Sequence, residues 1–246
     1  MAFVKNYEPA MSFGEDVAAT YDEDVRGDED DTVEFLARLA GDGPVLELAI
    51  GTGRIGLPLA ARGVRVAGIE ISPAMAARLQ AKPGGTEIAV TMGDFADVAV
   101  QGTFRLAYVV YNTFFNLLTQ DDQVRCFENV AAHLADDGAF VIEALVPDFL
   151  YRRRDDQYVV AETIEVDEVR LDVGRHDPVA QLLDESHVSL SSAGVRVFPI
   201  VTRYAWPCEL DLMARIAGLR LAERWAGWNE EPFTAASERH VSVYRR

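Results

Sequence analysis

Cysteine is scarce in this chain of 246 residues, which contains only Cys126 and Cys208. Neither belongs to a Cys-x-x-Cys pair or to a Cys/His cluster, so the sequence predicts neither a disulfide framework nor a metal site. Isolated thiols are typical of proteins kept in a reducing compartment. We therefore expect a cytoplasmic protein.

Long apolar runs are also missing. No stretch approaches the roughly eighteen apolar residues that a membrane-spanning helix needs, so no membrane partner is expected. The first residues lack the basic start and apolar stretch of a signal peptide. Hydrophobic residues nevertheless make up 49% of the chain, which is enough for the core of one α/β domain.

Positive charge is in short supply. The chain has 23 Lys and Arg residues against 40 Asp and Glu residues, a net charge of −17, and its lysines are Lys5 and Lys82 alone. The basic run at 152–154 is followed at once by Asp155 and Asp156, so it forms no basic patch. Such a field repels nucleic-acid phosphates and anionic lipids, and a nucleic-acid partner is therefore disfavoured.

Strand and helix patterns alternate through the first part of the chain. The predicted strands cover residues 45–50, 64–71, 87–92, 106–111 and 139–145. Helices are predicted after the first strand at 54–61, after the second from Pro73, and at 121–134, following an earlier helix at 32–40. Strands separated by helices pair in parallel through right-handed crossovers. We expect an α/β fold with a seven-stranded, mostly parallel sheet sandwiched by helices.

The rhythm changes after Pro147. Residues 158–172, 182–190 and 195–206 are rich in β-formers and separated by turn signals, which predicts an antiparallel β insertion after strand five. A helix at 209–217 and strands at 220–225 and 240–244 then complete the sheet. We expect one domain, composed of N-terminal cap helices (1–43), a core (44–146), the insertion (147–206) and the final helix and strands (207–246).

A glycine-rich loop follows the first strand. Gly51-Thr-Gly53-Arg-Ile-Gly56 reads G-x-G-x-x-G between a strand and a helix, a pattern compatible with NAD, FAD or S-adenosyl-L-methionine. Glu47 precedes Gly51 by four positions, where a carboxylate would repel a pyrophosphate but suit an ammonium or sulfonium group. Glu70 follows Gly51 by 19 positions, where it can accept the ribose hydroxyls, although NAD proteins share this feature.

These segments resemble the motifs of class I S-adenosylmethionine-dependent methyltransferases. Residues 47–53 resemble the first motif, with Ala49 in place of its first glycine; residues 70–75 resemble the second and 93–95 the third, and Tyr111-Asn112 falls at the fourth. The resemblance implies a Rossmann-like fold, S-adenosyl-L-methionine as cofactor and S-adenosyl-L-homocysteine as product. The cofactor-binding residues it implies are Tyr21, Arg26, Glu47, Gly51, Gly53, Glu70, Ile71, Met75, Asp94, Phe95 and Asn112.

In that scheme Glu47 holds the methionine amino end, Glu70 the ribose, and Asp94 with Phe95 the adenine. Ile71 and Met75 line the adenosine pocket. Tyr21 folds over the cofactor and Arg26 meets its carboxylate, as N-terminal segments do in many small-molecule members of the family.

The acceptor side carries fewer signals. The insertion resembles the caps of bacterial deoxysugar amino-methyltransferases and related natural-product enzymes, which implies O- or N-methylation of a small-molecule acceptor by in-line displacement, and a possible homodimer. We expect His187 to be a proton acceptor and Glu143 an acceptor ligand. An NAD(P)-dependent oxidoreductase and a non-catalytic adenosyl-ligand-binding domain remain the alternatives.

Overall fold

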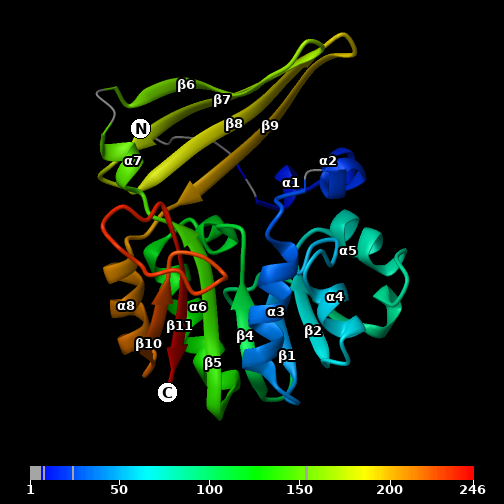
Figure 1. The fold of residues 1–246 in the computed structure, drawn as a ribbon, viewed down its shortest axis with the longest axis vertical. Coiled ribbons are helices and arrows are strands. Elements are labelled where there is room, and N and C mark those ends of the chain that lie inside the picture. Colours follow the sequence, from blue (N-terminus) through cyan, green and yellow to red (C-terminus); the bar gives the residue numbers. More distant parts are fainter. Residues whose placement is uncertain (1–6, 8, 24, 153–154) are drawn as a thin grey trace.

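The computed structural model describes Tyr7 and residues 9–23, 25–152 and 155–246, and it contains two β-sheets (Figure 1). The larger sheet has seven strands in the order β10-β11-β5-β4-β1-β2-β3. Their bounds are Val45–Leu48 (β1), Val66–Glu70 (β2), Ala89–Met92 (β3), Phe104–Val109 (β4), Leu134–Leu145 (β5), Arg220–Trp225 (β10) and Arg239–Arg245 (β11). This confirms the predicted α/β class.

The order of the strands determines where a ligand can bind. β1 pairs in parallel with both β2 and β4, and β4 pairs in parallel with β5, whereas β11 runs antiparallel to β5. The chain therefore moves outward from β1 in one direction and then returns to place β4 on its other side. In open α/β sheets the crevice for a ligand lies at this switch point, beyond the carboxyl ends of the strands.

Helices cover both faces of this sheet. They are α3 (Glu29–Ala40), α4 (Gly56–Ala61), α5 (Pro73–Gln80), α6 (Gln120–His133) and α8 (Pro207–Ile216). One buried apolar cluster includes Phe127 of α6 and Met213 of α8, and a second includes Phe35 of α3 and Leu59 of α4. α5 begins as predicted, because Ser72 accepts a hydrogen bond from the Met75 amide (3.2 Å) and Pro73 occupies the first turn.

The insertion forms a separate antiparallel sheet that rises above the carboxyl edge of the larger one (Figure 1). A short helix, α7 (Asp148–Tyr151), leads into β6 (Gln157–Ile164), β7 (Glu168–Asp177), β8 (Leu182–Ser191) and β9 (Gly194–Arg203), paired in that order. The prediction of one continuous β segment over 158–172 was wrong. A tight turn closed by the Glu165 amide and the Glu168 carbonyl (2.9 Å) divides it into two strands.

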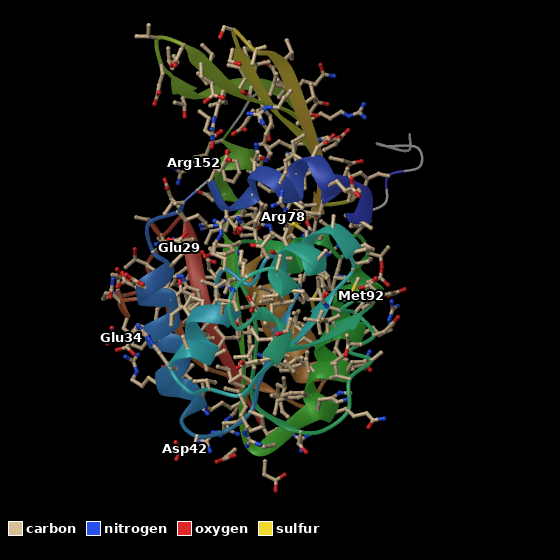
Figure 2. The ribbon with its side chains drawn as sticks, turned by 90° about the vertical axis from the view of Figure 1, so that its right-hand side faces the viewer. Glu29, Glu34, Asp42, Arg78, Met92 and Arg152 are labelled. Carbon is tan, nitrogen blue, oxygen red and sulfur yellow. The ribbon has the colours of Figure 1, made fainter. Side chains whose placement is uncertain are left out.

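The N-terminal helices lie between the two sheets, as Figure 2 shows from the side. They are α1 (Pro9–Ser12) and α2 (Glu15–Thr20), followed by a 3-10 turn at Tyr21–Glu23. The Ser12 hydroxyl donates to the Pro199 carbonyl of β9 (2.7 Å), and the Ser72 hydroxyl donates to the Phe13 carbonyl (2.5 Å). The segment is thus tied to β9 of the insertion sheet and to the start of α5. No helix in the described part of the chain has the length and apolar character that a membrane crossing requires.

Candidate functional site

The loop after β1 is held open by residues with left-handed backbone. Ala49, Gly51 and Gly53 have φ values of 56°, 57° and 79°. Gly53 also packs tightly, because a Cβ atom there would lie 2.4 Å from Cδ1 of Leu79. This shape turns the chain sharply at the carboxyl end of β1, next to the switch point.

Glu70, at the end of β2, is attached to this loop. Its carboxylate accepts one hydrogen bond from the Gly51 amide (2.8 Å) and another from the Ser72 amide (2.7 Å). Each oxygen has a second lone pair available for a hydroxyl group. Burial raises the pKa of Glu70, although the backbone hydrogen bonds oppose the shift. The side chain is therefore oriented before any ligand arrives.

One cavity joins the ends of β1, β2, β3 and β4. Seven of the residues predicted from the sequence line it together: Tyr21, Gly51, Glu70, Ile71, Met75, Asp94 and Phe95. Asp94 is fixed by the Ala96 amide, which donates to its Oδ1 (2.8 Å). Pro9, Phe13, Ala49, Thr113, Asn116 and Leu117 complete the wall. The two carboxylates and the apolar surfaces match a ligand with a ribose and a flat ring.

A network of charged contacts holds the N-terminal segment over this cavity. The Thr52 hydroxyl donates to Asp22 (2.6 Å), and the Lys82 ammonium contacts Asp22 (2.7 Å) and donates to the Thr52 carbonyl (2.7 Å). Partial burial would raise the pKa of Asp22, but the hydrogen bonds from Lys82 and Thr52 outweigh it and lower the pKa. We call Asp22, Thr52 and Lys82 the latch. It connects the segment directly to the glycine loop.

Comparison with known proteins identifies the family. Residues 45–138 match the family model described as a methyltransferase domain. The solved structure of the CcbJ methyltransferase from Streptomyces caelestis superposes with a TM-score of 0.91 at 38% identity, covering 97% of this chain and 99% of that one. The chain belongs to the S-adenosylmethionine-dependent methyltransferases.

Two more distant proteins resemble this methyltransferase. The curated cypemycin N-terminal methyltransferase from a Streptomyces species is 27% identical over 202 residues, or 82% of each chain. The sugar N-methyltransferase KedS8 from Streptoalloteichus sp. ATCC 53650 shares the fold, with a TM-score of 0.68 at 18% identity, covering 100% of this chain and 98% of that one. The chain is thus an enzyme that transfers a methyl group from S-adenosyl-L-methionine.

The cavity of the methyltransferase fits this cofactor better than a dinucleotide. Its titratable lining residues within the described chain are Tyr21, Glu70 and Asp94, and neither lysine nor arginine is among the residues that line it. Such a wall suits a ligand without phosphate. When bound, S-adenosyl-L-methionine supplies a methyl group on a positively charged sulfonium, which is a good leaving group.

Glu47 lies behind the loop, outside the set of residues that line the cavity. It is 3% exposed, and its Oε2 lies 2.7 Å from where a Gly56 Cβ would be, against the start of α4. That oxygen has no hydrogen-bond partner in the described structure. Burial raises the pKa of Glu47 to about 8, against the effect of the neighbouring Tyr108. Its predicted contact with the methionine amino group stays a prediction.

Contacts within the protein near the ends of β4 and β5 involve three of the predicted site residues: Glu143, Arg26 and Asn112. Glu143 accepts from the Tyr111 amide (2.7 Å) and from the Arg26 guanidinium (3.2 Å), which also lies over the Tyr111 ring at 4.3 Å from its centroid. Asn112 Oδ1 accepts from the Leu145 amide (2.6 Å). These contacts fix the N-terminal segment and the strand ends. The predicted ligand-binding roles of the three side chains stay predictions.

His187 lies on β8 of the insertion, and its Nδ1 is 2.7 Å from Oδ1 of Asp172 on β7. Its ring stacks on Phe198 of β9, with centroids 5.8 Å apart. Phe198 in turn contacts Phe13, a residue of the cavity wall, at 5.8 Å. Two aromatic rings therefore connect His187 to the cofactor cavity, and its predicted role as a proton acceptor stays a prediction.

Sequence reasoning missed three contributors to this site. Phe13 and Asp172 belong to no motif, and their importance depends on partners 185 and 15 positions away along the chain. The latch lysine, Lys82, was noted only as one of two lysines. That rarity was the one available signal, because a lone lysine close to a cofactor loop is a specific choice in an arginine-rich chain.

Proposed function

We propose that this enzyme methylates an amine nitrogen of a small natural-product molecule. The proposal is based on the polar groups in the part of the cavity wall that lies next to the insertion. The turn Thr113–Asn116, which leads to Leu117, lies against β9 there, and its polar lining groups are an alcohol and an amide. Such groups position an acceptor but do not remove a proton at neutral pH. A neutral amine needs no base to attack, whereas a hydroxyl does.

A relative supports nitrogen as the acceptor atom. The cypemycin enzyme, similar over 82% of the chain, is by its name an N-terminal methyltransferase. We take its chemistry, rather than its particular acceptor, as the model for this chain. In this proposal the enzyme aligns the nitrogen in line with the methyl group and excludes water, a contribution of about 7–11 kcal/mol to lowering the barrier.

We propose the following division of labour among the predicted residues. Glu70 binds the ribose, Asp94 and Phe95 the adenine, and Ile71 and Met75 the adenosine, while Tyr21 covers them. Gly51 presents the loop backbone, and Gly53 allows the loop to pack. Glu47, Arg26, Glu143 and Asn112 hold the loop and strand ends around the methionine part of the cofactor. His187 contacts the acceptor.

The test is a methyl-transfer assay with labelled S-adenosyl-L-methionine and matched pairs of small acceptors that differ only in amine against hydroxyl. We expect N-methylated products from the amines, identified by mass spectrometry, together with S-adenosyl-L-homocysteine. Methylation of the alcohols in preference to their amine counterparts would overturn the assignment of nitrogen while leaving the enzyme class intact.

We further propose that the enzyme is a homodimer formed through the outer face of the insertion sheet. Val159, Val195 and Val197 are exposed by 65%, 66% and 60% and lie on one face of that sheet, with Val173 and Leu190 beside them. Exposed apolar patches of this kind mark association surfaces. We also propose a cytoplasmic location, which suits the exposed free thiol of Cys208.

A further inference from the structure

Three polar side chains gather on one face of the insertion sheet. Asp172 on β7 and His187 on β8 are directly opposed in the pairing register, and Phe198 on β9 is opposed to His187. Glu162 sits where the register of β6 shifts, between Ala161 and Thr163. Bulges of this kind redirect a side chain. Ligand atoms of Glu162, Asp172 and His187 all lie within 4.8 Å of one another.

The face that carries this cluster looks toward the cofactor half of the molecule. Phe198, in the same cross-strand row, packs edge-on against Phe13 at an interplanar angle of 71°. Phe13 belongs to the wall of the cofactor cavity. The cluster therefore lies on the inner side of the insertion, two ring contacts of 5.8 Å each from that wall. An acceptor bound beneath the insertion can reach both places.

Acidic side chains elsewhere on the insertion sheet pair with arginine, whereas those of the cluster do not in the described part of the chain. Glu168 pairs with Arg170 (3.2 Å) and Asp184 with Arg175 (2.7 Å). Within the described residues, neither Glu162 nor Asp172 makes an ion pair with lysine or arginine, and Asp172 is engaged by His187 alone. Carboxylates that have no lysine or arginine partner in the protein can form charge-assisted hydrogen bonds with an ammonium group of a ligand.

We infer that Glu162, Asp172 and His187, whose ring stacks on Phe198, form a subsite for an ammonium group of the acceptor. The inference rests on the proposed N-methyltransferase function and deepens it: the acceptor is an extended molecule whose basic group is separate from the nitrogen that receives the methyl. Asp172 is a positioning residue, because it holds Nδ1 of His187 and leaves Nε2 to accept a hydrogen bond from the ammonium. Glu162 supplies the second carboxylate.

The experiment uses the whole enzyme saturated with S-adenosyl-L-homocysteine and follows the imidazole nitrogens of His187 by NMR, assigned with the His187→Gln variant. Benzylammonium chloride is the cationic probe and benzyl alcohol its neutral counterpart. We expect the ammonium, and not the alcohol, to shift the His187 signals. Glu162→Gln and Asp172→Asn should each weaken that binding by about tenfold, since each loses a hydrogen bond to a charged group. Glu165→Gln removes the same charge from the neighbouring turn and should change nothing.

Three results would overturn the subsite. They are equal responses to both probes, unchanged affinity in Glu162→Gln and Asp172→Asn, and tight binding of zinc chloride at His187 without any response to the ammonium, which would make the cluster a metal site. Glu162 is exposed, so its glutamine variant tests the idea even if Asp172→Asn folds poorly. Methylation of amines without an ammonium response would refute the subsite alone, and methylation of alcohols alone would refute the proposed function.

Discussion

Ala49 has a backbone conformation that is unfavourable for alanine. It stands where the related motif has glycine, and its φ of 56° lies in the left-handed region, where an L-residue with a Cβ atom is strained. Gly51 and Gly53, two and four positions later, adopt similar φ values without this cost. The loop thus keeps the backbone shape of the motif although the Cβ atom of Ala49 is strained in it.

Replacing Ala49 with glycine should therefore stabilise the protein. We expect Ala49→Gly to raise the free energy of unfolding by about 1 kcal/mol, the relief of strain exceeding the added flexibility of the unfolded chain. Denaturant unfolding measures it. Ala77→Gly, at an exposed helical position of α5, is the matched control and should lower the free energy by a similar amount. Destabilisation by both substitutions would contradict the argument.

Asp94 offers a test of the adenine end of the cavity. Asp94→Ala should weaken binding of S-adenosyl-L-homocysteine by about 1–3 kcal/mol, because a polar ligand atom loses its partner. Glu70→Ala should act in the same range at the ribose. Calorimetric titration provides the measurement, with Asp97→Ala as a control at an exposed carboxylate that pairs with Arg125 (3.0 Å). Unchanged affinity in both cavity variants would refute these assignments.

The cavity residues were predictable because the chain places them at fixed points. Glu70 ends one parallel strand, Asp94 and Phe95 follow the next, and all carboxyl ends of such strands meet at one edge. Phe13, Lys82 and Asp172 were not predictable, since nothing in their local sequence indicates the residues they contact. Glu47 was located correctly in its strand, but only the structure shows that its carboxyl is buried behind the loop.

The carboxyl group of Glu47, on strand β1, makes the stability of the protein depend on pH. Burial raises the pKa of Glu47 to about 8 from 4.5 in the unfolded chain. Between these values the folded protein holds a proton that the unfolded chain releases, so stability present below pH 4.5 is lost as the pH rises toward 8. His240, whose pKa burial lowers to about 3, acts in the opposite direction at lower pH.

Comparison with Glu47→Gln isolates this contribution. Because glutamine resembles the protonated carboxyl, the free energy of unfolding of the natural protein should fall relative to that of the variant between about pH 5 and about pH 8, by on the order of a few kcal/mol. The contribution of His240 cancels in the difference. Denaturant titrations at both pH values test this, and a constant difference would show that Glu47 is ionised in the fold.

The N-terminal segment is the element that closes the cavity, and the latch is its charged attachment. Lys82→Met should speed dissociation of S-adenosyl-L-homocysteine by about twofold to fivefold, with a smaller effect at high salt. Stopped-flow measurement of ligand release tests the prediction. Arg78→Met, on the nearby helix α5 (Figure 2), is the control for removing a positive charge. Equal effects of the two variants would indicate a general electrostatic change.

The boundaries of elements were less predictable than their existence. The expected loop between the helix at 121–134 and the strand at 139–145 is absent, because β5 starts at Leu134 directly after α6. The shift in register between Phe104 and Leu106 of β4 absorbs the extra residues of β5. The sequence Asp136-Asp-Gly138 is typical of a turn. It does not show that the neighbouring strand β4 can pair with β5 on both sides of these residues.

At the scale of the whole molecule, the outer face of the insertion predicts self-association. Val197→Asp would place a charge at the centre of the apolar face and should convert a dimer into a monomer. Size-exclusion chromatography with light scattering gives the mass. Val179→Asp, at a 94% exposed position in the turn after β7, is the control and should leave the dimer intact. A natural protein that is already monomeric would end this proposal.

The two ends of the insertion lie close together. Tyr151 on the way in and Tyr204 on the way out share a hydrogen bond of 2.7 Å between their hydroxyls, and the Tyr151 ring also lies 5.6 Å from that of Trp206. A segment with adjoining ends can be exchanged without altering the path of the chain on either side. Residues 152–203 can therefore be exchanged as a unit, in evolution or by design, so that the enzyme transfers the same methyl group to a different acceptor.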